Sequence, residues 1–187
     1  MSSDGAFRPI SKAPGSTGRL HRCQSESVGV MQTADESRLV ATRRISAGER
    51  LFRIEGETTQ RPSRYSLQID ENLHLDIGTG RSAEEILGRY YWRFINHSCD
   101  PSVAIEGREV VALRAIDPGE AVTYNYNTTE WDIAEPFACR CGSANCLQEI
   151  RGFKHLGVAQ RERLRGVAPH LARKTRREDA GTVRDPG

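Results

Sequence analysis

The sequence predicts a mainly β protein with short helices. From Val28 onward, short runs of β-prone residues alternate with turn residues, which is typical of strands in small twisted sheets. Helical patterning is confined to two stretches, and no internal repeat is visible. The chain of 187 residues, 37% of them hydrophobic, is long enough for one modest domain or for one domain with tails.

The predicted strands follow one another through most of the chain. They are bounded by turn-forming residues, notably at residues 46–48 and 117–119. We expect strands at residues 38–45, 50–56, 65–69, 73–77, 108–116 and 120–126. Strands this short predict several small sheets.

Two helices are predicted between and after these strands. The first covers residues 83–94, where Ser82 is placed to cap the helix and Glu85, three residues later, completes a capping box. The second covers about residues 157–168 and ends before Pro169, because proline does not continue a helix.

The two ends of the chain differ from its body. Residues 1–25 are rich in Ser, Gly, Pro and Arg without apolar periodicity, which predicts a disordered leader. Residues 151–187 hold ten basic and four acidic side chains, whereas residues 1–150 hold 17 basic and 21 acidic ones. An acidic body favours a basic peptide partner over a nucleic-acid backbone, so we expect no direct nucleic-acid binding. Two solvated faces without a partner are an equal alternative.

Composition also limits the compartment. No run approaches the roughly 20 apolar residues that cross a bilayer, and the N-terminus lacks the basic-then-apolar pattern of a signal peptide. The five cysteines, an odd number, favour reduced thiols or metal ligands over a disulfide framework. We therefore expect an intracellular, reducing compartment, cytoplasm or nucleus, and no membrane partner.

Three cysteines form the first chemical motif. Cys139, Cys141 and Cys146 stand in a C-x-C-x4-C pattern, and thiolates this close can converge on one tetrahedral Zn²⁺. They supply only three of the four ligands. Cys99 is the candidate for the fourth, because Cys23 lies in the predicted leader. Redox thiols and ordinary buried cysteines are the alternatives.

Two further segments carry polar and aromatic residues. RFINHSCDPSV holds Asn96 and His97 in a stretch of poor helix propensity, which favours a tight functional loop. In VTYNYN, the strand period of two places Tyr124 and Tyr126 on the same face. Taken singly, a capping Asn beside a core His and a pair of packing tyrosines are the more ordinary interpretations.

Together, these segments resemble a known family. In order and spacing, RFINHSCDPSV, GEAVTYNYN and PFACRCGSANC resemble the signature of the SET-domain protein lysine methyltransferases with their zinc-binding post-SET segment. VATRRISAGERLFRIEGE is similar to the family's opening strand pair, and YSLQIDENLHLD to its central strands. The resemblance covers about residues 28–153 and implies the SET β-fold of small twisted sheets with knot-like threading. The implied parts are a SET domain over 26–130, a post-SET zinc segment over 131–153 and a basic, helical or disordered tail over 154–187.

The resemblance also implies an activity. The family transfers methyl groups from S-adenosylmethionine to lysine in a basic protein or peptide, of which a histone-like tail is one form. Tyr126 matches the active-site tyrosine, and Tyr65 matches a tyrosine between the cofactor and the lysine channel. Tyr124 matches a position where tyrosine restricts the reaction to mono- or dimethylation. The alternative is a zinc-stabilised SET-like module that binds peptide without methyltransferase activity.

The implied binding residues surround the Asn-His pair. Residues implied to contact S-adenosylmethionine are Arg38, Leu39, Val40, Tyr65, Arg93, Phe94, Asn96, His97, Tyr126 and Phe137. Residues implied to bind zinc are Cys99, Cys139, Cys141 and Cys146. The chain departs from the family pattern at Glu36 and Arg38, where the family usually has glycines that let the backbone approach the cofactor. Without these glycines the backbone can be held away from the cofactor, which favours the alternative of a peptide-binding module without methyltransferase activity.

Overall fold

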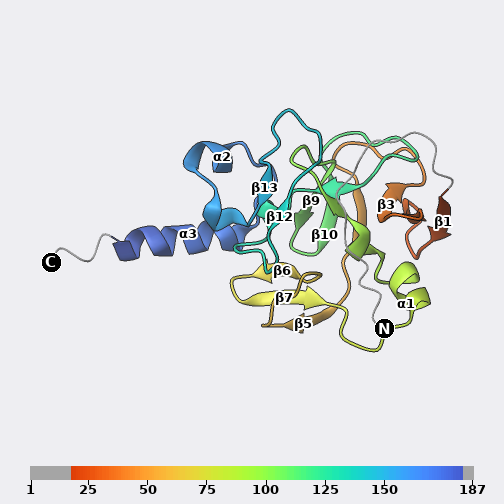
Figure 1. The fold of residues 1–187 in the computed structure, drawn as a ribbon, viewed down its shortest axis with the longest axis horizontal. Helices are drawn as coiled ribbons and strands as arrows, with labels where there is room; N and C mark the ends of the chain where they lie inside the picture. The colour runs from red at the N-terminus through yellow and green to blue at the C-terminus, as the bar shows by residue number, and fades with distance from the viewer. Residues whose placement is uncertain (1–17, 183–187) are drawn as a thin grey trace.

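The computed structural model describes residues 18–182, and within them the strands form five small sheets. Figure 1 shows these sheets as a mainly β body, with α3 extending from one end and β1 and β3 at the other. The predicted fold class, mainly β with short helices, is confirmed.

The first sheet includes two strands, the first two in the chain, that lie outside the predicted strands. It is antiparallel, in the order β1 (Arg19–Arg22), β2 (Val28–Gln32), β3 (Ser37–Ala41). The predicted disordered leader is therefore wrong at Arg19–Arg22, while residues 1–17 lie outside the described residues. Pairing with β2 gives this polar segment backbone hydrogen bonds that its composition does not reveal.

Two further antiparallel sheets form the middle of the molecule. Their strand orders are β4 (Arg50–Arg53), β10 (Glu109–Ala112), β9 (Val103–Glu106), and β5 (Glu57–Thr59), β7 (Leu73–Asp76), β6 (Leu67–Asp70). All of these except β5 and β9 overlap predicted strands, and β6 extends one residue beyond the predicted bound at residue 69. β9 was missed because Val103, Ala104 and Ile105 are buried on both faces and lack the alternation typical of a half-buried strand.

Two short pairings position the chemical motifs. β8 (Asn96–His97) runs parallel to β11 (Thr123–Tyr124), which brings together the RFINHSCDPSV and VTYNYN segments. The strand predicted over 120–126 is shorter because the chain turns into the 3₁₀ helix η2 (Tyr126–Thr128). β12 (Phe137–Ala138) pairs with β13 (Glu149–Ile150) on either side of the cysteine triplet.

The first predicted helix is split in two. α1 (Ala83–Gly88) begins with the predicted capping box, in which Ser82 accepts from the Glu85 N–H and the Glu85 carboxylate accepts from the Ser82 N–H. The helix ends near Gly88, and the following residues form the 3₁₀ helix η1 (Tyr91–Phe94). Tyr91 and Trp92 of η1 are buried, so packing against the core determines this segment's conformation.

The C-terminal helices differ from the prediction at Pro169. η3 (Phe153–His155) and α2 (Val158–Glu162) come first, and α3 (Pro169–Thr182) then begins at the proline. Proline is favoured at the first position of a helix, where its missing N–H needs no partner. Among the described residues, no helix is both long and apolar enough to span a membrane.

Two clusters of buried apolar side chains stabilise the fold. The larger one extends across the first three sheets and η1 and contains the fully buried Val30, Leu39, Leu75, Val110 and Ile116. The smaller one consists of Trp131, Phe153, Ala168 and Leu171, with three partly buried apolar neighbours, and joins α3 to the segment that follows η2.

Candidate active site

A cavity of about 290 Å³ lies where β8, β11 and η2 meet the segments 62–67 and 133–137. Apolar side chains such as Ile54, Ile105 and Ile133 form much of its wall. The predicted site residues that line it are Tyr65, Arg93, Asn96, His97, Tyr124, Tyr126, Phe137 and Cys139. The structure therefore gathers residues from four separate stretches of the sequence around one concave site.

Asn96 and His97 form β8 and line this cavity. The Asn96 Oδ1 atom is buried and has no hydrogen-bond partner among the described residues. His97 Nδ1 accepts from the Tyr126 backbone N–H at 3.2 Å, which leaves the ring proton on Nε2, 3.3 Å from Cys99 Sγ. Burial lowers the pKa of His97 to about 3, so the ring is neutral.

The two tyrosines of the VTYNYN motif lie together even though Tyr126 is outside the strand. Their ring centroids are 4.7 Å apart, and Phe137 lies edge-on to Tyr126 at 5.9 Å. The Tyr126 hydroxyl donates to the Ile95 carbonyl at 3.0 Å. Burial raises the pKa of both phenols above the ordinary value, so both remain protonated and can donate hydrogen bonds.

Tyr65 and Arg93 form the more open side of the cavity. Tyr65 is 39% exposed, and the Arg93 guanidinium lies 4.3 Å from the centroid of its ring. Arg93 Nε is buried without a hydrogen-bond partner in the part of the chain that the structure describes. The stacked pair thus presents a cation with an unused donor beside an accessible aromatic ring.

Four residues implied to bind the cofactor do not line the cavity. Leu39 and Val40 are buried side chains of β3, and the Leu39 carbonyl accepts from the Val122 N–H. Arg38 pairs with Glu36 at 2.8 Å, and Phe94 packs against the larger apolar cluster. Contact of these residues with a cofactor stays a prediction.

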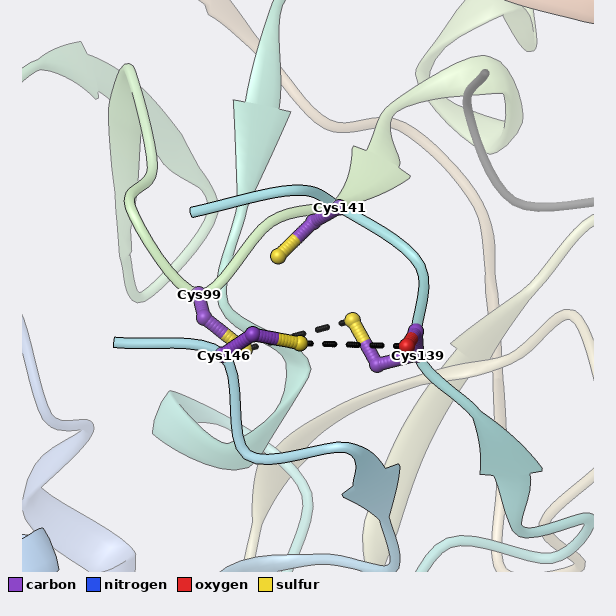
Figure 2. A group of neighbouring side chains, drawn as sticks. All are labelled: Cys99, Cys139, Cys141 and Cys146. Carbon is purple, nitrogen blue, oxygen red and sulfur yellow. Dashed lines mark hydrogen bonds between the residues drawn. The ribbon is translucent and has the colours of Figure 1, made fainter. Parts of the chain in front are cut away.

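The four cysteines implied to bind zinc come together in space. Their sulfur atoms all lie within 4.8 Å of one another, and those of Cys99 and Cys139 are 4.0 Å apart. Figure 2 shows Cys99, from the loop after β8, facing the three cysteines that follow β12. Sulfur atoms around a tetrahedral Zn²⁺ at about 2.3 Å would be roughly 3.8 Å apart, so a small contraction of this cluster fits zinc. Cys23 lies elsewhere, and its thiol donates to the Val28 carbonyl.

The thiols of this cluster differ in how readily they ionise. Burial raises the pKa of Cys99 to about 12 and also raises that of Cys139. Burial opposes ionisation of Cys141 as well, but hydrogen bonds, first from Ser143, lower its pKa to about 6. Four thiolates need a cation to offset their mutual repulsion, so metal binding here would release protons.

Glu130 lines the cavity and was not predicted. Its side chain is buried, and its Oε1 accepts from the Gln68 backbone N–H at 2.8 Å and from the Thr129 hydroxyl at 3.3 Å. Burial raises the pKa of Glu130 to about 7. No signal in the sequence could have identified it, because glutamate is ordinarily exposed and nothing in NTTEW indicates burial.

Comparison with known proteins agrees with this geometry. The SET domain family model matches residues 36–127. Methyltransferase flvH of Aspergillus flavus is 41% identical over 82 residues, covering 42% of this chain and 46% of flvH. Histone-lysine N-methyltransferase trithorax of Drosophila virilis is 33% identical over 154 residues, covering 70% of this chain and 4% of trithorax. The chain thus spans less than half the length of these curated relatives.

Among solved structures, the chain is similar to KRYPTONITE in a crystal structure with mCHH DNA, H3(1-15) peptide and SAH. The TM-score is 0.48 at 24% sequence identity, with 64% of this chain and 28% of that chain covered. The match to the family model and the adjacent Asn-His and tyrosine motifs lead to one conclusion: residues 36–127 of this chain are a SET domain.

Proposed function

We propose that this chain is an S-adenosylmethionine-dependent protein-lysine N-methyltransferase that acts on a basic peptide segment. The observation that carries the proposal is the single cavity in which Tyr126 meets the Asn96-His97 pair. A lysine side chain is long and narrow, and a cavity with apolar walls and phenol donors suits its methylene stem and its amine. The names of flvH and trithorax, both methyltransferases, support the same reaction class.

The chain's own polar atoms fit the cofactor. S-adenosylmethionine carries an ammonium and a carboxylate, and when bound it would supply a methyl group from a sulfonium. Asn96 Oδ1 is a buried acceptor without a partner among the described residues, which suits an ammonium. Arg93 Nε is an unused buried donor in the same cavity wall, which suits a carboxylate.

The residues around the cavity would prepare and orient the amine. A free lysine has a pKa near 10.4, and the apolar wall would lower it by desolvation, which favours the neutral amine needed for attack. Tyr126 and Tyr124 keep their protons because burial raises the pKa of both. They therefore act through position and hydrogen bonding, which is the main requirement of an in-line displacement.

Zinc would support the wall of this cavity. Cys139 lines the cavity and is also a candidate zinc ligand, and Phe137, two residues earlier, packs against His97 and Tyr126. The His97 Nε2–H points at the Cys99 sulfur, an arrangement that would orient a metal-bound thiolate. Such thiols stay reduced in an intracellular compartment, which we propose as the location.

Two finer features of the substrate are part of the proposal. The acidic balance of residues 1–150 favours a basic partner, such as a histone-like tail, over nucleic acid. The Tyr124 hydroxyl occupies space beside Tyr126, so we expect mono- or dimethylation. Tyr124→Phe should shift products towards trimethyl-lysine, as read by mass spectrometry of the peptide.

The first test is calorimetric titration of the zinc-loaded protein with S-adenosylmethionine, alone and with a pool of basic lysine peptides. We expect micromolar binding that Asn96→Ala abolishes, and methyl transfer to peptide that Tyr126→Phe abolishes while cofactor binding remains. Peptide binding without any cofactor binding would instead establish the inactive peptide-binding module, with Glu36 and Arg38 in place of the usual glycines as the cause.

A further inference from the structure

Glu130 is a buried carboxyl group in the proposed lysine site, and the reaction described above assigns it no role. It is 8% exposed and lines the cavity together with Tyr124 and Tyr126. Its charge is close enough to both phenols to add to the effect of burial in raising their pKa. The carboxyl group therefore lies near the point where a target amine would meet these tyrosines.

The two oxygens of this carboxyl group have different surroundings. Oε1 accepts from the Gln68 N–H and the Thr129 hydroxyl, so it joins β6 to the end of η2. In the described part of the chain no hydrogen bond reaches Oε2 and no Lys, Arg or His forms an ion pair with Glu130. An amide would cap the Gln68 N–H equally well without placing an ionisable group in an apolar wall.

A buried carboxylate without a cation is costly, and the cost falls when a cation binds beside it. A lysine ammonium brings both a positive charge and N–H donors, whereas a neutral side chain of the same length brings neither. We propose that the Glu130 carboxylate is the hydrogen-bond acceptor and counter-charge for the target amine, which makes Glu130 a specificity-determining residue for a cationic side chain. The inference rests on the proposed function for the identity of the ligand.

Glu130→Gln is the variant that isolates this role. Glutamine keeps an oxygen to accept from the Gln68 N–H and replaces only Oε2, by an NH₂ group that repels an ammonium. Glu55→Gln is the matched control, because Glu55 does not line the cavity, its side chain is 53% exposed, and it pairs with Arg89 across 2.9 Å. The zinc-loaded full chain is titrated with a basic peptide and with the same peptide carrying norleucine in place of lysine.

We expect the wild-type protein to prefer the lysine peptide and Glu130→Gln to lose that preference. A hydrogen bond to a charged group predicts a loss on the order of ten- to hundredfold in affinity for the lysine peptide, and the same increase in KM during turnover. Affinity for the norleucine peptide and for S-adenosylmethionine should remain, and Glu55→Gln should match the wild type. The thermal midpoint of Glu130→Gln should not fall, which excludes a folding defect.

Three results would overturn the inference: equal lysine preference in Glu130→Gln and wild type, an equal preference for norleucine in the wild type, or a parallel loss of cofactor affinity in the variant. The proposed function fails differently. If lysine preference depends on Glu130 but no methyl group is transferred to any peptide, the acceptor role stands and the methyltransferase activity does not.

Discussion

The larger apolar cluster and the cysteine segment, residues 131–153, hold their parts of the chain in different ways. The cluster draws buried side chains from three sheets, with Leu39, Leu75 and Ile116 fully enclosed. The cysteine segment has a single pair of two-residue strands, few buried apolar side chains and three thiols that lie close to that of Cys99. Apolar burial is therefore sufficient for the first region, whereas the second depends on particular contacts and, we propose, on zinc.

The cavity takes residues from both regions. Asn96 and Tyr126 come from the region built on the larger cluster, and Phe137 and Cys139 come from the cysteine segment. The motif residues can therefore be held in place while one wall of the site is still missing. Substitutions in the region of the larger cluster should therefore lower the stability of the core strongly. Substitutions in the cysteine segment should lower it much less.

The largest effect is expected from Leu39→Ala. The leucine side chain is fully buried, and its truncation leaves a void that the surrounding sheets fill only partly. We expect a loss of roughly 2–5 kcal/mol in the free energy of unfolding, measured by urea denaturation followed by tryptophan fluorescence. A loss below about 1 kcal/mol would contradict the view that apolar burial alone holds this region.

The second effect is a pH dependence that arises from Glu130. Burial raises its pKa in the folded protein to about 7, above the ordinary 4.5 of a glutamate, so between these values the folded state binds more protons than the unfolded state. Stability should therefore fall as pH rises from about 4.5 to 7, by about 3 kcal/mol at most. In Glu130→Gln, the free energy of unfolding, measured by urea denaturation at each pH, should not show this decrease. An identical pH profile for variant and wild type would show that other groups cause the decrease.

A smaller effect is expected where the cysteine segment joins the core, at Gly152. This glycine has φ near +111°, and a Cβ there would lie 2.6 Å from the Trp131 carbonyl oxygen. Its N–H also donates to Asn127 Oδ1 at 3.0 Å. Gly152→Ala should cost about 1–3 kcal/mol, seen as faster hydrogen exchange in residues 131–153 with the larger cluster still protected. Uniform loss of protection would show that the two regions unfold together.

The smallest effect on the core is expected from loss of the metal. Cys141→Ser should lower bound zinc from about one per chain to near zero, because a tetrahedral structural site needs all four ligands. Core stability, by the same urea assay, should change by less than about 1 kcal/mol. Cys23→Ser is the matched control and should keep its zinc, since the Cys23 thiol bonds to the Val28 carbonyl away from the cluster. Zinc loss in Cys23→Ser would show that the ligand set is wrong.

Features that depend on neighbouring residues, or on the spacing of metal ligands in the chain, could be predicted from the sequence. The Ser82–Glu85 capping box and the turn at residues 117–119 depend on neighbours in the chain, and both are present. The convergence of Cys99 on the cysteine triplet follows from the needs of a four-ligand metal and the family resemblance, and the sulfur atoms do meet.

Features decided by distant partners could not be predicted. β1 exists because β2 offers an edge, and η1 replaces the end of a predicted helix because Tyr91 and Trp92 pack inward. The burial of Glu130 depends on Gln68, 62 residues earlier, whose backbone N–H reaches its carboxyl oxygen. Such contacts leave no periodicity in the sequence.

The contact between Cys99 and Cys139 spans 40 residues and encloses β9, β10 and β11. Parallel pairing of β8 with β11 also needs a crossover, so each contact closes a long loop and can form only after the intervening residues have been synthesised. The N-terminal hairpins can therefore form early in synthesis. The proposed active site is complete only after the last cysteine, Cys146, has left the ribosome. The proposed methyl transfer would then be acquired only after residues 139–146 have been synthesised.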